Sequence, residues 1–252
     1  MKLKCLGLVT TAAIVASAFV ASAAWAEAPE IGRCVSHSGG TYTNNVCTKA
    51  AKGKKVGSFE WEPGASKKKF TGVGGVGTLE TVNRAIVTCK AEKSAGELTS
   101  SKTVGNVNVT FTGCESAGYK CISTGAKEGE IATNLLAGTV VWEKYAKKVA
   151  IDLVPQSTEL FVEFQCGPAN AKVKGSVLAP LPVNKAQTTF EEKFSAKYGK
   201  QKPEYYYTSK TEKVKDVLLA KLGGPAAEFE QSGQTINNSQ TDEEALEINT
   251  KA

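Results

Sequence analysis

Short apolar stretches of strand type, separated by turn residues, fill the chain from about residue 68 onward and constrain the fold most. In "NVNVTFTGC", Val107, Val109 and Phe111 alternate with polar residues, and "KVAIDLV" at residues 148–154 repeats the two-residue period. Such alternation, interrupted by Gly, Pro, Asn or Ser, is typical of antiparallel sheets. We therefore predict a mainly β protein with one antiparallel β-sandwich or barrel over residues 67–252.

One segment within this region predicts a helix instead. The apolar residues of "TEKVKDVLLAKLGG" (211–224) recur at helical spacing, and Gly223–Gly224 would end the helix. A strand over residues 217–222 is the alternative.

The N-terminal residues predict export. Lys2 and Lys4 precede an apolar stretch rich in small residues, and Ala24-Trp25-Ala26 fits a cleavage site for a signal peptide over residues 1–26. Retention as an anchor is the alternative, because residues 5–26 are long enough to span a bilayer. No second stretch of this kind follows, so we expect a secreted or cell-envelope protein with no membrane insertion after cleavage.

The cysteines that follow the signal peptide are even in number, which in an exported chain indicates disulfides. They are Cys34, Cys47, Cys89, Cys114, Cys121 and Cys166. Short loops favour the pairs Cys34–Cys47 and Cys114–Cys121, which leaves Cys89 with Cys166. Their spacing does not match a zinc site, so we expect no metal and no other cofactor.

Residues 27–66 form a segment of different character. It is polar and rich in Gly and Lys, it contains the Cys34–Cys47 loop, and "GSFEWEPG" supplies one short strand. We predict a small disulfide-stapled N-terminal segment without a core of its own.

The charge pattern narrows the partners. The net charge is +6, but only Arg33 and Arg84 are arginines, so we expect no nucleic-acid binding. Basic residues gather in residues 33–72 and acidic residues in 226–252. These are either two solvated surfaces or a basic arm that contacts an acidic polymer of the cell envelope.

A literal G-x-G-x-x-G occurs in "FTGVGGVGTLETV", at Gly72, Gly74 and Gly77. A dinucleotide-binding turn requires an apolar strand before it and a helix after it. The preceding segment "GASKKKFT" is not an apolar strand, and the following segment "TLETVNRAIVTCK" predicts two strands instead of a helix. The glycines instead indicate a bulge or a close approach of backbone segments.

Residues for catalysis are scarce. The only histidine, His37, lies in the Cys34–Cys47 loop, where we expect it to be exposed. Glu191 and Glu192 would face opposite sides of a strand, and we expect these and the other glutamates to be solvated. We therefore predict no enzyme, although Glu128 or Glu192 buried beside a second carboxylate would argue for a hydrolase and against a binding module.

Tyr205 and Tyr207 in "PEYYYTSK" are the candidate ligand-binding residues. On a strand they project from one face, with Tyr206 on the other, and aromatic rings beside lysines can stack on sugars. The alternative is that one face packs in the core.

The segments "CVSHSGGTYTNNVCTK", "VGNVNVTFTGCES", "EFQCG" and "EEALEINT" resemble a family of uncharacterised exported proteins from actinobacteria. The resemblance covers most of the mature chain and implies an exported, disulfide-bonded, non-enzymatic protein. We expect a secreted or envelope-associated protein that binds a cell-wall or extracellular polysaccharide. A secreted glutamate-based carbohydrate hydrolase and a β-barrel carrier of a small apolar ligand are the alternatives.

Overall fold

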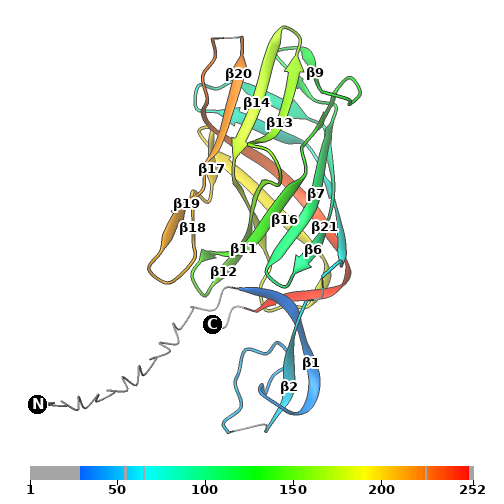
Figure 1. The fold of residues 1–252 in the computed structure, drawn as a ribbon, viewed down its shortest axis with the longest axis vertical. Coiled ribbons are helices and arrows are strands. Elements are labelled where there is room, and N and C mark those ends of the chain that lie inside the picture. The colour runs from blue at the N-terminus through cyan, green and yellow to red at the C-terminus, as the bar shows by residue number, and fades with distance from the viewer. Residues whose placement is uncertain (1–28, 54–55, 65, 225, 250–252) are drawn as a thin grey trace, which may run out of the picture.

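The computed structural model describes residues 29–249, except residues 54–55, 65 and 225. The signal peptide expected over residues 1–26 lies outside the described residues. The described chain consists of strands and loops without a helix, and every strand pairing is antiparallel, so the prediction of a mainly β barrel is confirmed (Figure 1). No described segment forms a helix long and apolar enough to cross a membrane.

Eight strands form a closed ring in the upper half of Figure 1, called here the upper ring. Each strand is hydrogen-bonded to the next, and the last returns to the first. In ring order they are β4 (Gly77–Thr81), β5 (Ile86–Cys89), β8 (Glu115–Ser116), β9 (Tyr119–Ser123), β13 (Leu160–Cys166), β14 (Ala169–Gly175), β20 (Leu218–Gly223) and the first part of β21 (Glu230–Asn249).

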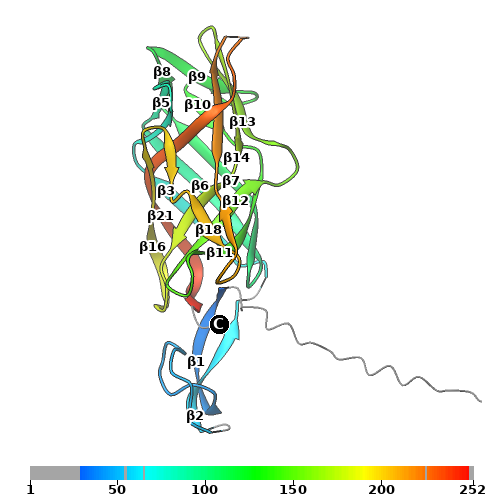
Figure 2. The same ribbon diagram turned by 90° about the vertical axis from the view of Figure 1, so that its left-hand side faces the viewer.

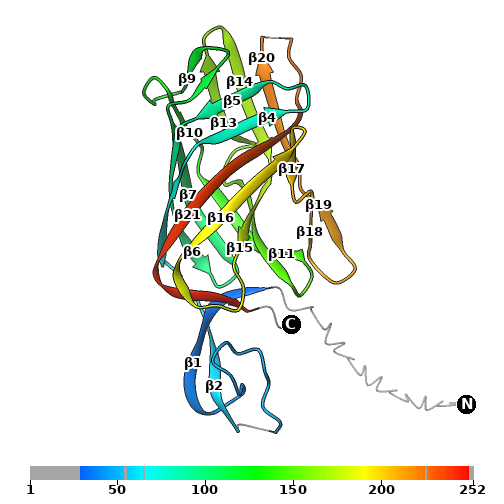
Figure 3. The same ribbon diagram turned by 180° about the vertical axis from the view of Figure 1, so that it is seen from behind.

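A second set of strands curls around the lower half of the molecule and is called here the lower ring (Figure 3). In spatial order it contains β15 (Val177–Leu181), β12 (Lys148–Pro155), β11 (Leu136–Lys144), β7 (Thr103–Thr112), β6 (Ala91–Ser100), β3 (Lys69–Gly74), the second part of β21, and β16 (Gln187–Lys197). β15 and β16 follow each other in the chain and lie in contact, which completes the circuit.

The long strand β21 joins the two rings. Residues 232–235 pair with β4 of the upper ring, and residues 238–242 pair with β3 of the lower ring. Figure 3 shows β21 crossing the molecule diagonally from one ring to the other. The buried core follows the same path, because apolar side chains of both rings belong to one cluster.

The N-terminal segment is a hairpin of β1 (Glu30–Gly40) and β2 (Gly57–Pro63) that projects from the lower end of the barrel (Figure 2). Among its described residues, those at the base join the barrel, where Glu30–Gly32 pair with the end of β21. The disulfide Cys34–Cys47 staples the projecting part, as the sequence predicts.

The helix predicted over residues 211–224 is wrong. This segment forms β19 (Lys213–Lys215), which pairs with β18 (Tyr205–Tyr207), and then β20. Leu218 and Ala220 are buried, two residues apart, and β20 has a partner strand on either side. The ladder partners on both sides therefore override the helical spacing, and the strand alternative over 217–222 is correct. The remaining strands are β10 (Glu130–Ala132) and β17 (Lys200–Lys202).

Two of the three predicted disulfide pairs are wrong. Cys89 bonds to Cys114, and Cys121 bonds to Cys166, whereas Cys34–Cys47 is as expected. Strand register explains the difference, because Cys121 and Cys166 are direct partners in the β9–β13 ladder. Three disulfides fit an oxidising environment.

Candidate functional site

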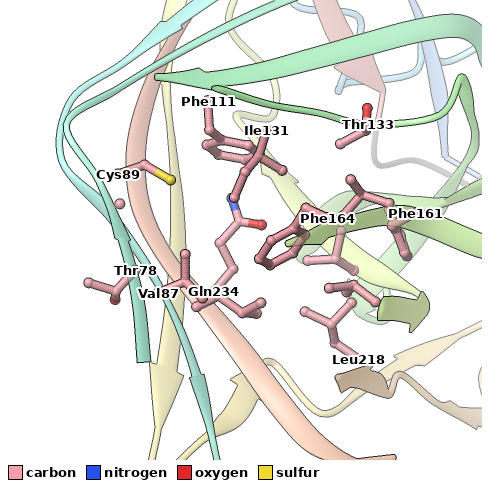
Figure 4. A pocket seen from close by; sticks show the side chains of 15 residues that line it. Thr78, Val87, Cys89, Phe111, Ile131, Thr133, Phe161, Phe164, Leu218 and Gln234 are labelled. Atoms are coloured by element: carbon pink, nitrogen blue, oxygen red, sulfur yellow. The ribbon is translucent and has the colours of Figure 1, made fainter. Parts of the chain in front are cut away.

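The interior of the upper ring contains a mainly apolar cavity, seen from close by in Figure 4. It leaves about 80 Å³ of space for the centres of water-sized molecules. Phe111, Ile131 and Phe164 surround the side chain of Gln234 in the figure, and only Thr78 and Thr133 add further polar side chains to the wall. This upper cavity is therefore suited to an apolar group.

The lower ring encloses a second cavity, with about 90 Å³ of the same kind of space. The two cavities adjoin, because five residues line both: Phe111, Thr133, Phe161, Val177 and Gln234. A third and smaller cavity lies beyond the second, toward the end of the barrel, and shares Phe70, Val104, Ile151 and Gln240 with it. The barrel thus holds a line of cavities along its interior.

One wall of the lower cavity is polar. Strand register places four residues in a row across β16, β21, β3 and β6, since Glu192 pairs with Asn238, Asn238 with Gly74, and Gly74 with Glu92. We call this set the acid row. The opposite wall, from β7, β11, β12 and β15, is apolar and includes Val107, Leu136, Ile151 and Ala179. The lower cavity therefore has one polar face and one apolar face.

Glycines make room for this polar wall. A Cβ atom on Gly74 would lie 2.6 Å from Glu92 Oε2, and a Cβ atom on Gly72 would lie 2.3 Å from Ser94 Oγ and 2.8 Å from Asn238 Nδ2. At these two glycines of the G-x-G-x-x-G, a cluster of polar side chains makes the close approach, rather than the backbone segment that the sequence predicts.

The hydrogen bonds of the acid row are incomplete. Asn238 Nδ2 donates to Glu192 Oε2 at 2.9 Å. Glu92 Oε2 and Asn238 Oδ1 are buried and have no hydrogen-bond partner among the described residues, and Glu92 and Asn238 are each only 5% exposed. Buried polar atoms are nearly always hydrogen-bonded, so two buried acceptors without a donor are an exception that needs an explanation.

Burial also changes the ionisation of the two glutamates. It raises the pKa of Glu192 to about 8, and the negative charges of Glu92 and Asp242 act in the same direction, against the hydrogen bond from Asn238. Burial raises the pKa of Glu92 as well. At neutral pH, Glu192 is therefore mostly protonated, and burial shifts the pKa of Glu92 in the same direction.

The expectation that the glutamates are solvated is wrong for Glu192 and Glu92, which are each 5% exposed, and for Glu247, which is 2% exposed. It is correct for Glu191, which is exposed on the other side of β16, and for Glu128, which is exposed and lies 3.1 Å from Lys120 Nζ. The alternation across Glu191 and Glu192 was predictable, but the inward direction of Glu192 depends on the register of β16 against β21.

The two candidate tyrosines are in different surroundings. Tyr205 is 38% exposed, and Lys213 Nζ lies 3.8 Å from the centre of its ring. Tyr207 is half-buried, packs against the main core and pairs with Trp142 of β11. Only Tyr205 is exposed enough for a ligand to stack on it.

A second buried polar cluster lies where β12, β15 and the β18–β19 hairpin meet. Ser176 Oγ donates to Asp216 Oδ1 at 2.5 Å, while Asp216 Oδ2 and Asp152 Oδ1 have no hydrogen-bond partner in the part of the chain that the structure describes. Burial raises the pKa of Asp216 to about 6. The adjacent pocket leaves only about 10 Å³ for the centre of a water-sized molecule, so it has room for one water molecule.

Groups for metal binding or histidine catalysis are not assembled in the described part of the chain. It contains no cluster of three or more His, Cys, Asp or Glu side chains placed to hold a metal ion. His37 is exposed on the projecting hairpin. Comparisons with protein-family models, with curated proteins and with solved structures gave no match.

Glu92 and Asn238 were not identified from the sequence. Each lies at an inward-facing position of its strand. From the sequence alone, a polar residue in an alternating strand is normally assigned to the solvent-facing side. The signal that points to them is the pair Gly72 and Gly74, because two glycines at inward positions of one strand leave space that neighbouring side chains fill.

Proposed function

We propose that this protein is a non-catalytic binding protein that holds a small, largely apolar ligand inside its barrel. The observation that carries the proposal is the pair of adjoining cavities, whose shared wall includes Phe111, Phe161 and Val177. Interior cavities lined by apolar side chains with a few placed polar groups are the usual form of a small-molecule site. Closed β architectures commonly use their interior in this way.

The proposal is tested with xenon, an apolar atom that enters dry protein cavities. Methyl NMR spectra of the oxidised protein are recorded under increasing xenon pressure. We expect saturable shifts for the methyl groups of Val173, Val177 and Leu218, which line the upper cavity. Val82 and Ile86 are exposed and serve as internal controls that do not saturate.

A cavity-filling variant makes the test specific. Val177 lines both cavities, so Val177→Phe is expected to abolish the xenon shifts at Val173 and Leu218 while the protein remains folded. Overpacking costs roughly 1–3 kcal/mol, and a thermal unfolding curve checks that the barrel tolerates it. If the unaltered protein shows no saturable xenon shifts at these methyl groups, the proposal of an apolar-ligand carrier is refuted.

The buried Glu192 near Glu92 also requires the hydrolase alternative to be considered. A glycosidase needs a sugar ring and usually a water molecule between or beside its two carboxyl groups. In the acid row, Asn238 and Gly74 occupy the positions between Glu192 and Glu92, and the facing wall is apolar. These features support binding rather than hydrolysis.

Binding of a cell-wall or extracellular polysaccharide is the second candidate function. Its support is the exposed ring of Tyr205 with the ammonium group of Lys213 above it. In a co-sedimentation assay with insoluble polysaccharides, Tyr205→Ala should release the protein, whereas Tyr198→Ala, which alters a more exposed tyrosine, should not. Equal binding by both variants would argue against a site at Tyr205.

We further propose that the protein acts outside the cytoplasm, as a secreted or envelope-associated protein. The three disulfides support an oxidising compartment. N-terminal sequencing of the exported protein tests this, and a chain that begins near Glu27 is the expected result.

A further inference from the structure

The lower cavity is acidic and has no basic group to balance it. Among the described residues that line the upper and lower cavities, none is Lys, Arg or His, whereas Glu92 and Glu192 both line the lower one. A carboxylate or phosphate ligand would place its negative charge beside Glu92 without a counter-ion. The wall therefore disfavours anionic ligands such as fatty acids.

The unpaired atoms of the wall are acceptors. Within the described part of the chain, Glu92 Oε2 and Asn238 Oδ1 lack partners although their residues are more than nine-tenths buried, and both residues line the lower cavity. A ligand that brings hydrogen-bond donors would complete this wall. A primary ammonium group has three N–H donors and no acceptor, which is sufficient for both atoms.

The charge of the wall matches a single ammonium group. With its pKa raised to about 8, Glu192 is mostly neutral at pH 7, so the wall carries at most the one negative charge of Glu92. One ammonium group neutralises this charge, and its hydrogen bonds to a carboxylate are of the stronger, charge-assisted kind.

The apolar parts of the site determine the rest of the ligand. The wall that faces the acid row is apolar, and the lower cavity adjoins the upper one at Phe111, Phe161 and Val177. A slender hydrocarbon chain whose ammonium group lies at Glu92 can extend along this wall toward the upper cavity. A bulky or branched group would exceed the limited space.

We propose that the lower cavity is a binding site for a small apolar amine, with its ammonium group on Glu92 Oε2 and Asn238 Oδ1 and its hydrocarbon chain directed toward the upper cavity. This inference rests on the proposed function, since it specifies the ligand of the same interior.

The test compares three probes that share one hydrocarbon chain. Hexylamine, 1-hexanol and hexanoate are titrated into the oxidised protein at pH 7 and followed by calorimetry. We expect hexylamine to bind about tenfold or more tightly than 1-hexanol, since a hydrogen bond to a charged group replaces a neutral one, and hexanoate to bind weakest.

Variants connect this order of affinities to the acid row. Glu92→Gln keeps the size of the side chain but removes its charge, so hexylamine should lose about tenfold in affinity while 1-hexanol changes little. Glu191→Gln, on the exposed side of β16, is the matched control and should bind all three probes as the unaltered protein does. Thermal unfolding shows whether each variant folds. If a variant does not fold, the order of affinities of the three probes for the unaltered protein still decides the test.

The outcomes separate the two proposals. If 1-hexanol or hexanoate binds as tightly as hexylamine, or if Glu92→Gln binds hexylamine as well as Glu191→Gln does, the amine site is refuted while the apolar carrier stands. If none of the three probes binds and xenon also fails to saturate the cavity methyl groups, the carrier itself is refuted. The expected order with a loss confined to Glu92→Gln supports both.

Discussion

At the scale of single residues, Glu192 connects the cavity to the pH dependence of stability. Its pKa is raised from 4.5 to about 8 on folding, so the folded protein binds more protons than the unfolded chain between these values. The contribution of Glu192 to the free energy of unfolding is therefore highest at or below pH 4.5. It is lost as the pH rises toward 8, with a slope of at most about 1.4 kcal/mol per pH unit.

Glu192→Gln should remove this contribution. We expect the variant to gain stability relative to the unaltered protein as the pH rises from 5 to 8, because no buried carboxyl group then has to ionise. Urea unfolding at a series of pH values measures the difference. Glu191→Gln is the control, and a pH dependence that is the same in both variants would contradict the assignment.

Gly74 is the second residue whose role can be tested directly. A Cβ atom at this position would lie 2.6 Å from Glu92 Oε2 and 2.9 Å from Ile236 Cδ1, whereas one at Gly75 would meet nothing within 4 Å. We therefore expect Gly74→Ala to cost roughly 1–3 kcal/mol and to weaken ligand binding, because Glu92 must move. Gly75→Ala should leave both unfolding and binding unchanged, and equal effects of the two substitutions would contradict this account.

The glycines also show how far the site could be predicted from the sequence. Their spacing indicated a close approach, and the flanking segments excluded a dinucleotide turn, which are both local properties of the chain. The residues that approach them, Glu92 and Asn238, come from strands on either side of β3. Their position depends on non-local register, which a single sequence does not specify.

At the scale of elements, the disulfides differ in what they stabilise. Cys121–Cys166 joins β9 to β13 inside the upper ring and spans 45 residues, whereas Cys34–Cys47 spans 13 residues in the projecting hairpin. Longer loops lose more conformational entropy in the unfolded chain when they are closed.

Cys121→Ala/Cys166→Ala should therefore destabilise the barrel by about 2–5 kcal/mol. Cys34→Ala/Cys47→Ala should change the main unfolding transition little, because most of the hairpin lies outside the barrel. Calorimetric unfolding of both variants makes the comparison, and a larger loss from the hairpin pair would contradict it.

Elements were predictable where one period dominated the sequence. Residues 106–112 and 148–154 alternate in two-residue steps and lie in β7 and β12. The segment 211–224 satisfied both helical and strand spacing, and its neighbours β14 and β21 decided the outcome. Non-local strand pairing also decided the disulfides. Cys114 and Cys121 are close in sequence, but Cys114 bonds to Cys89 and Cys121 bonds to Cys166.

At the scale of the whole molecule, the barrel interior is continuous while its wall consists of two rings. The ring closures could not be derived from the sequence, because alternation predicts strands but does not give their order. What unites the rings is β21, whose residues 232–242 contribute Ser232, Ile236 and Asn238 to the buried interior of both. A ligand in the adjoining cavities would contact both rings, so binding should stabilise them together.

This shared strand predicts one cooperative unfolding unit. If β21 separates from either ring, both lose a central hydrogen-bonded strand, so neither ring has a lower-energy opening of its own. Native-state hydrogen exchange should give similar opening free energies for the amides of Val173 in the upper ring and Val140 in the lower ring. The amide of Phe59 in the projecting hairpin should exchange through an easier opening. Distinctly different values for Val173 and Val140 would show instead that the two rings unfold separately, and a ligand bound across both cavities would then couple two otherwise independent units.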